Sequence, residues 1–318
     1  MKKLINLLVI VFVVVIMVSL TACPPGKGDD DDGGQLAFEL INGNTAYRVK
    51  KGTVKSGVVN IPAQHSSARS SAGAPDSLPV LEVGAPTDDE VTGAFYNTQI
   101  TAVTIPEGVT SIYAVGFAYC PELTSVTLPE SLEFMGWMAF ALTPKLQSII
   151  IPGNTKFDDG SGNHSGHFLE SGIKSLILSE GITELSDLIF RSCHYLTDVT
   201  LPSTLKIIND HAFSGCGRLT NITLPEGLET IGEFAFAGLY GHYSGDNYNI
   251  SAPLDSITIP ASVTSVGRGA FWDGRPDWLN PKRLTIYIDG HANQESADAA
   301  WGEEWRLHSD ATIIYRGQ

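Results

Sequence analysis

A pattern of 23 residues that returns along most of the chain limits the possible folds more than any other feature. The stretch LTDVTLPSTLKIINDHAFSGCGR is followed directly by LTNITLPEGLETIGEFAFAG, which keeps the apolar positions, the Pro and the Ala-Phe pair. Copies are spaced by 23, 23, 27, 23, 23 and 35 residues, and they begin at Ile100, Leu123, Leu146, Ile173, Leu196, Leu219 and Leu254. This period predicts a stack of small structural units and is too short for propeller blades or helical pairs.

Each copy combines a strand with a return segment. In LTSVTLP the apolar residues Leu123, Val126 and Leu128 point inward and Thr127 points outward, as in a half-buried strand. Pro129 ends the strand because Pro cannot donate to a ladder. The apolar spacing of the second half suits a short helical or irregular segment. One unit cannot bury its own apolar side, so we expect the copies to stack through parallel strands about 4.8 Å apart.

One aromatic residue holds the same place in every copy. The positions are Phe95, Phe117, Phe140, Phe168, Phe190, Phe213, Phe236 and Phe271. Recurrence at a structural position predicts that these rings pack in the core and do not form a ligand site.

The unit L-x-x-V-x-L-P-x-x-L-x-x-I-x-x-x-A-F-x-x-C resembles the BspA-type leucine-rich repeats of bacterial surface proteins over about residues 90–283. The resemblance implies an α/β, right-handed solenoid with a parallel sheet on one face and short helical or irregular return segments. It also implies non-enzymatic roles such as attachment to host or neighbouring-cell proteins. The repeat at Leu146 loses its Ala, and Ser179 replaces the usual Pro, so we expect irregularity in the middle of the array.

The chain begins with a targeting segment, residues 1–22. Two Lys residues precede an apolar run from Leu4 to Val18 that is interrupted only by Asn6. The following LTAC resembles the lipobox of bacterial lipoproteins, which implies lipid attachment at Cys23 and an extracytoplasmic, surface-exposed position on the cell envelope. A plain helical anchor is the alternative, and it would leave the protein in much the same compartment. Residues 23–34, PPGKGDDDDGG after the Cys, are expected to form a disordered tether.

Caps are expected at both ends of the array, because terminal repeats would otherwise expose the core. We assign residues 35–99 to an N-terminal cap, 100–283 to the repeats and 284–318 to a C-terminal cap. LAFELINGNTAYRV predicts a hairpin around Asn-Gly-Asn. At the other end we expect a strand from Thr285 to Ile288, a helix in ADAAWGEEW and a final strand in ATIIY.

Little in the sequence points to chemistry. The net charge of −15 and the scattered Lys and Arg argue against nucleic-acid binding. Catalytic and phosphate-binding motifs do not stand out, so we predict neither an enzyme nor a cofactor.

The Cys and His residues that could be reactive are more simply explained by structural positions. Cys120, Cys193 and Cys216 each follow the recurring Phe by three residues and are expected to be small buried residues, with a Cys193–Cys216 disulfide as the alternative. His164 and His167, near two Asp residues at 158 and 159, carry the zinc alternative, but their Gly-rich surroundings favour a surface loop. We therefore predict no metal.

Two surfaces are candidates for partner binding. The first is the outward face of the sheet, where Ile150 and Ile177 interrupt an uncharged row of mostly Thr; the candidate residues are Thr127, Ile150, Ile177, Asp198, Thr200 and Thr223. The second is a pair of loops whose aromatic residues suit protein contacts or sugar rings; these are Tyr240, Tyr243, Tyr248, Trp272 and Trp278. The Trp residues would alternatively plug the approach to the C-terminal cap.

These surfaces lead to three functional hypotheses. The leading one is adhesion to an extracellular or host protein, with the membrane reached through the lipid. The others are carbohydrate binding by the loops and a structural role in the envelope. The sequence leaves the partner's identity and the oligomeric state open.

Overall fold

The computed structural model describes residues 35–43, 45–50, 52–66, 77–84, 93–158, 166–238, 254–272, 284–306 and 311–317. The chain divides into two units, Met1–Asp32 and Gly33–Gln318, and all described residues belong to the second. The targeting segment, Cys23 and the tether expected over residues 23–34 therefore lie outside the described residues. In the part that is described, no helix has the length and apolar character needed to cross a membrane.

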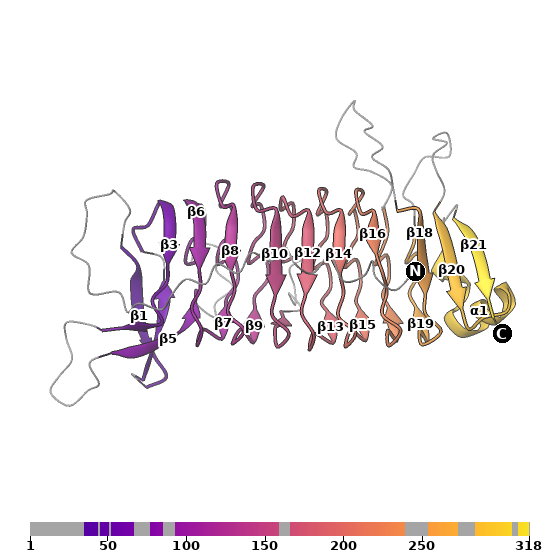
Figure 1. The fold of residues 1–318 in the computed structure, drawn as a ribbon, viewed down its shortest axis with the longest axis horizontal. Coiled ribbons are helices and arrows are strands. Elements are labelled where there is room, and N and C mark those ends of the chain that lie inside the picture. The colour runs from indigo at the N-terminus through magenta and orange to yellow at the C-terminus, as the bar shows by residue number, and fades with distance from the viewer. Residues whose placement is uncertain are drawn as a thin grey trace, which may run out of the picture. The chain divides into compact units, whose positions relative to one another are not determined.

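The second unit is a solenoid whose longer strands stack in parallel along one side (Figure 1). They form three groups: β3 (Ser56–Asn60), β6 (Gln99–Thr104) and β8 (Ser125–Thr127); β10 (Ser148–Ile151), β12 (Ser175–Leu178), β14 (Asp198–Thr200) and β16 (Asn221–Ile222); and β18 (Ser256–Ile259), β20 (Thr285–Asp289) and β21 (Thr312–Arg316). Exposed and buried residues alternate along β10 and β12. We call the outward side of these strands the sheet face. The predicted parallel sheet is confirmed.

The sheet reaches into the segment assigned to the N-terminal cap. β3 already pairs in parallel with β6, from Ser56 and Gln99 to Asn60 and Thr104, with one register shift between Gly57 and Val58. The solenoid is therefore built by strands from both 35–99 and 100–283.

The return segments consist of turns and very short strands. These strands are β7 (Ser111–Ile112), β9 (Phe134–Met135), β11 (Lys156–Phe157), β13 (Glu184–Leu185), β15 (Ile207–Ile208), β17 (Thr230–Ile231) and β19 (Ser265–Val266). They make a second, narrow set of parallel ladders. Of the two return forms left open by the sequence, the irregular one is observed, because so short a segment cannot recover the cost of nucleating a helix.

The recurring Phe residues form a continuous stack in the core. All eight are buried, and neighbouring ring centroids lie between 5.1 Å (Phe95 to Phe117) and 5.7 Å (Phe140 to Phe168) apart. Interplanar angles between neighbours reach only 22°, so the rings lie nearly parallel. The predicted core role of this position is confirmed.

Most of the turns that carry a recurring Phe have a strained backbone. On either side of Phe117, Val115 and Tyr119 have positive φ values of 50° and 57°. Such conformations cost a non-glycine residue about 1–3 kcal/mol each. Hydrogen bonds to the next turn hold them: the Val115 N–H donates to the Trp137 carbonyl at 3.0 Å, and the Phe117 N–H donates to the Ala139 carbonyl at 2.9 Å. Positive φ values also flank Phe140 and Phe190, and the N–H groups of both Phe residues donate to the next turn.

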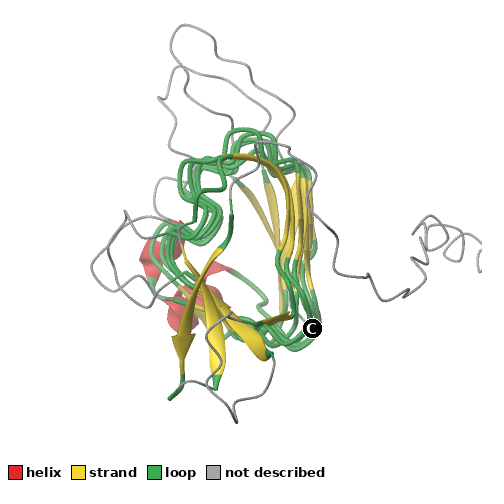
Figure 2. Cartoon of the chain, turned by 90° about the vertical axis from the view of Figure 1, so that its left-hand side faces the viewer, coloured by secondary structure: helices red, strands yellow, loops and turns green. Residues whose placement is uncertain are grey.

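The hairpin predicted from the sequence lies at the N-terminal end of the coil. The hairpin is present, with β1 (Ala37–Ile41) antiparallel to β2 (Ala46–Lys50). β2 then pairs in parallel with β5 (Leu78–Val83), which also pairs with β7 and with the short antiparallel strand β4 (Gln64–His65). Figure 2 looks toward this end and shows the long strands of the coil stacked along one wall.

The C-terminal end is closed by a small helical element. The strand, helix and strand predicted for this end are all present. They are β20, helix α1 (Gln294–Trp301), which is followed by the 3-10 helix η2 (Glu303–Arg306), and β21. Asn293 caps α1 by accepting from the Ser296 N–H at 3.0 Å. Trp305 is fully buried and donates to Asp298, so the helix seals the core.

Pairing between turns is interrupted at three places in the described coil. The sheet face lacks pairing between β8 and β10 and between β16 and β18, and the return strands lack it between β11 and β13. The last two interruptions coincide with the spacings of 35 and 27 residues. The irregularity expected near the repeat at Leu146 takes this form.

Replacing Phe190 with Ala tests the stack. Phe190 is buried between two other rings, so its truncation should lower the free energy of unfolding by about 3–5 kcal/mol. Urea unfolding followed by circular dichroism measures the loss. Tyr195→Ala removes an exposed ring and serves as the control, with an expected loss below about 1 kcal/mol. Equal losses in the two variants would contradict a structural role for the stack.

Candidate functional site

The sheet face carries two rows of outward side chains with almost no charge. One row contains Thr104, Thr127, Ile150, Ile177, Thr200, Thr223, Thr258, Tyr287 and Ile314. The other contains Ala102, Ser125, Ser148, Ser175, Asp198, Asn221, Ser256, Thr285 and Thr312. Thr fits a pleated, half-exposed strand without any ligand, so most of the first row follows from strand propensity alone.

Ile150 and Ile177 depart from that explanation. They are direct partners on β10 and β12, and they are 57% and 40% exposed. Their strand neighbours Ile149 and Leu176 point inward and are buried, so the core does not need the two exposed side chains. Single exposed apolar residues are ordinary on protein surfaces, whereas two in contact register form a small apolar patch.

The other candidates on the sheet face surround this patch. Thr200 continues the row next to Ile177, and Asp198 lies in the second row of the same strand. The Asp198 carboxylate accepts from the Thr197 hydroxyl at 2.7 Å. Thr127 and Thr223 are also exposed, but the structure records no pairing of β8 with β10, and Thr223 follows the last residue of β16. The geometry therefore brings Ile150, Ile177 and Thr200 together most closely.

Only one of the candidate loop aromatics lies within the described residues. Trp272 is 39% exposed and packs edge-on against Phe234, with ring centroids 5.8 Å apart. Tyr240, Tyr243, Tyr248 and Trp278 fall outside the described residues, as does any grouping with them.

The three Cys residues of the solenoid are free and buried, and Cys193 does not pair with Cys216. Each thiol donates to the carbonyl of a recurring Phe in the preceding turn; the acceptors are Phe95, Phe168 and Phe190, at 3.1–3.2 Å. Burial raises the pKa of Cys193 to about 12 and raises that of Cys216 as well. Protonated at neutral pH, these thiols are poor nucleophiles and serve as small core residues.

His167 is buried and not part of an exposed loop. It occupies the position before the recurring Phe, where other repeats place Ala139, Ala212 or Ala235. Neither ring nitrogen has a partner at hydrogen-bonding geometry. Burial lowers the pKa of His167 to about 4, and the nearby Met135 backbone offsets only part of this effect. His164 and residue 159 lie outside the described residues, and within the described ones no group of three or more His, Cys, Asp or Glu side chains is arranged to hold a metal.

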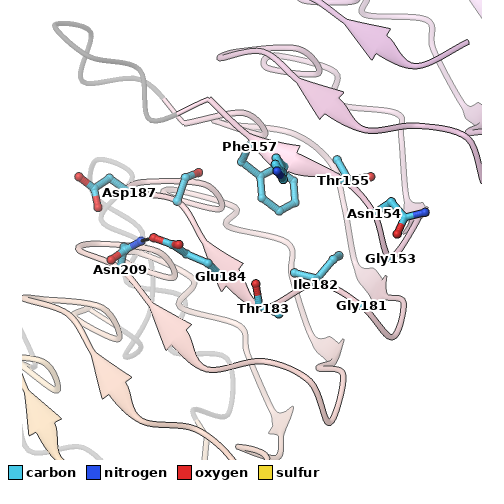
Figure 3. A pocket seen from close by; sticks show the side chains of 12 residues that line it. Gly153, Asn154, Thr155, Phe157, Gly181, Ile182, Thr183, Glu184, Asp187 and Asn209 are labelled. Carbon is cyan, nitrogen blue, oxygen red and sulfur yellow. Dashed lines mark hydrogen bonds between the residues drawn. The ribbon is translucent and has the colours of Figure 1, made fainter.

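A cleft of about 590 Å³ lies between β11 and β13 (Figure 3), and one of its lining residues, Phe157, contacts His167. Its lining is mostly polar and comes from three successive turns: Gly153, Asn154, Thr155, Lys156, Phe157, Gly181, Ile182, Thr183, Glu184, Ser186, Asp187 and Asn209. None of these residues was a candidate from the sequence. Two features of the sequence point to this place: the 27-residue spacing and the replacement of the usual Ala by His at position 167. Both fall where two neighbouring turns pack differently from the others.

Comparison with family models matches residues 91–161 and 164–275 to the BspA-type leucine-rich repeat region, in six copies. The chain belongs to the BspA-type leucine-rich repeat family. The match includes all eight residues of the Phe stack and most of the strands that form the sheet face. A comparison with curated proteins finds no match.

Solved structures of similar fold are bacterial proteins. A leucine-rich repeat protein from Bacteroides ovatus is 21% identical and has a TM-score of 0.55, over 91% of this chain and 72% of that one. A leucine-rich cell surface protein from Faecalibacterium prausnitzii is 19% identical with a TM-score of 0.46, over 94% of this chain and 97% of that one. At these identities the first likeness supports the fold of this BspA-type protein and nothing finer.

His167→Ala should reduce the acid sensitivity of the protein. The unfolded chain binds a proton at this side chain near pH 6.5 and the folded chain only near pH 4. The free energy of unfolding therefore falls as the pH drops through that window, by about 2–3 kcal/mol at pH 4.5, and is fully recovered above pH 6.5. Thermal melts at pH 7.5 and 4.5 measure the difference. His65 and His211 remain in both proteins, so equal acid losses in wild type and variant would contradict this role for His167.

Proposed function

We propose that this protein is a lipid-anchored surface protein of bacteria that attaches to an extracellular protein through its sheet face and catalyses no reaction. The exposed pair Ile150–Ile177, in the middle of a broad uncharged face, is the observation that carries the proposal. Apolar side chains exposed within a polar rim are typical of protein-binding surfaces.

The charge distribution supports the same partner class. The chain has a net charge of −15, yet Asp198 is the only charged residue in the two outward rows of the sheet face. Charge is depleted at the centre of protein interfaces. A partner surface with its own apolar and hydroxyl-bearing groups would lose little solvation of charged groups on docking here.

The anchoring part of the proposal depends on the sequence of the chain's beginning. LTAC, after a positively charged start and an apolar run, has the order of regions found in a lipoprotein signal, and the family occurs in bacterial surface proteins. The lack of catalysis is supported by the protonated, buried thiols and by the family's use as a binding scaffold.

Ile150→Asp/Ile177→Asp should weaken capture of the protein partner at least tenfold, which corresponds to about 1.4 kcal/mol. Two carboxylates would have to be desolvated at the centre of the contact, while the solenoid keeps its core because both positions are exposed. Pull-down from extracellular matrix proteins, followed by titration of the captured protein, measures the effect.

The matched control is Leu40→Asp/Tyr119→Asp, which adds the same charge at exposed apolar residues away from the sheet face. Capture should survive in this variant. Unchanged capture by the Ile150/Ile177 variant, with its circular dichroism spectrum intact, would rule out the sheet face as the binding surface.

Intact-mass spectrometry of the membrane fraction should find a diacyl modification on Cys23 as the first residue of the mature protein. Cys23→Ala should remove the lipid. The mass of the variant should then lack the diacyl group, and less of the protein should be found in the detergent-soluble membrane fraction. An unmodified Cys23 in the wild-type protein would contradict lipid anchoring.

A further inference from the structure

The cleft lies where strand pairing is missing between β11 and β13. On the return side of the coil, β5, β7, β9 and β11 pair successively, and so do β13, β15, β17 and β19. Between β11 and β13 the structure records no pairing, although the same two turns pair on the sheet face through Ser148–Ser175 and Ile151–Leu178. The turns are thus joined on one side and separated on the other.

Bulky side chains explain the separation. Phe157 occupies the inward position of β11 that Met135 and Leu185 hold on neighbouring strands. Its ring meets His167 edge-on, with centroids 5.5 Å apart. Phe157 and His167 thus occupy two positions that hold an aliphatic residue and an Ala in other turns. The larger side chains keep β11 and β13 too far apart to form backbone hydrogen bonds.

The two turns that form most of the cleft are in close backbone contact at two glycines. A Cβ added to Gly153 would overlap the Glu180 carbonyl oxygen, and one added to Gly166 would overlap the Leu188 carbonyl oxygen. Glycine is required at both positions because no other residue allows the backbones to approach so closely. The cleft therefore lies between two turns whose backbones are held together at both glycines.

The lining combines hydrogen-bond donors and acceptors with one aromatic ring. Figure 3 shows Phe157 on the β11 side and Glu184, joined to Asn209, on the β13 side. The Asn209 amide donates to the Glu184 carboxylate at 2.7 Å and so fixes its orientation. Asp187 is held in a similar way, since one of its carboxylate oxygens accepts from the Asp210 N–H at 3.2 Å.

Ser186 supplies an independent sign of a ligand. Ser186 is one of the residues that line the cleft, and its hydroxyl is buried without a hydrogen-bond partner among the described residues. Buried hydroxyls in proteins are nearly always hydrogen-bonded, and one left alone destabilises the fold. A molecule bound in the cleft would satisfy it.

We infer that this cleft binds a neutral sugar, in the form of one hexopyranose ring. Carboxylates and amides such as those of Glu184 and Asn209 pair with adjacent sugar hydroxyls, which both donate and accept, and the Phe157 ring suits the apolar face of the sugar. The cleft volume lies within the range of about 300–1,000 Å³ for small-molecule sites.

Other ligand classes fit less well. A peptide strand added between β11 and β13 would find edges of only two residues each. The two carboxylates of Glu184 and Asp187 disfavour an anion, and Lys156 offsets one of them, so little net charge is left to select a cation such as an arginine side chain.

The test is a titration of the unit Gly33–Gln318, which contains the described core and both of its caps. The probes are glucose, galactose, mannose and N-acetylglucosamine, with N-acetylneuraminic acid and free arginine as charged comparisons. Backbone amide chemical shifts report binding. At least one neutral sugar should saturate with a Kd at or below about 10 mM and shift the amides of Phe157, Glu184 and Ser186.

Two variants probe the site directly. Glu184→Ala and Ser186→Ala should each weaken sugar binding about tenfold. Ser186→Ala should leave the unfolding midpoint unchanged or raised, since the hydroxyl it removes has no protein partner. Thr230→Ala is the matched control, because Thr230 holds on β17 the register position that Glu184 holds on β13, and its sugar binding should equal that of wild type.

The inference is overturned if none of the four neutral sugars saturates, if free arginine or the acidic sugar binds more tightly, or if both cleft variants bind like wild type. Ile150→Asp/Ile177→Asp should bind the sugar normally. The cleft and the sheet face are thereby tested separately, and failure of one leaves the other standing.

Discussion

The hydrogen bonds that join each Phe-bearing turn to the next are the constraint on which the solenoid depends. The Phe117 N–H reaches the Ala139 carbonyl, and the same bond recurs from turn to turn along the coil. It sets the spacing at which the rings stack, and it holds residues such as Val115 in a backbone conformation that is unfavourable in isolation. Each turn is therefore stable only because its neighbour is present, as expected for repeats that cannot bury an apolar side alone.

Much of this organisation was predictable from the sequence because it repeats. Periodic apolar positions identified the parallel sheet, and one recurring Phe identified the core, since a residue type that returns at a fixed spacing must meet its own copies. The hairpin around Asn42 and Gly43 and the strand–helix–strand close were predictable from local turn and amphipathic signals. The narrow return ladder was not, because two residues such as Ile207 and Ile208 carry too little pattern to separate a short strand from a turn.

Of the two candidate sites, one was predictable from the sequence and the other was not. Ile150 and Ile177 stood out in the sequence because they break a repeated position, and the structure places them side by side and exposed. The cleft between β11 and β13 was beyond sequence reasoning for a different reason. It results from the combined size of Phe157 and His167, which are ten residues apart in the chain and meet only when the turn closes. His167 had drawn attention as half of a His pair, and its burial gives it a packing role instead.

The three interruptions in strand pairing fall on different boundaries between turns. Where β8 and β10 are unpaired, the return strands β9 and β11 of the same turns remain paired; where β11 and β13 are unpaired, β10 and β12 are paired. Where β16 and β18 are unpaired, β17 and β19 keep their ladder. No interrupted boundary among the described turns thus loses both of its ladders. A pulling force along the coil would therefore meet at least one set of backbone hydrogen bonds at each of these boundaries, so the irregular surfaces do not make them mechanical weak points.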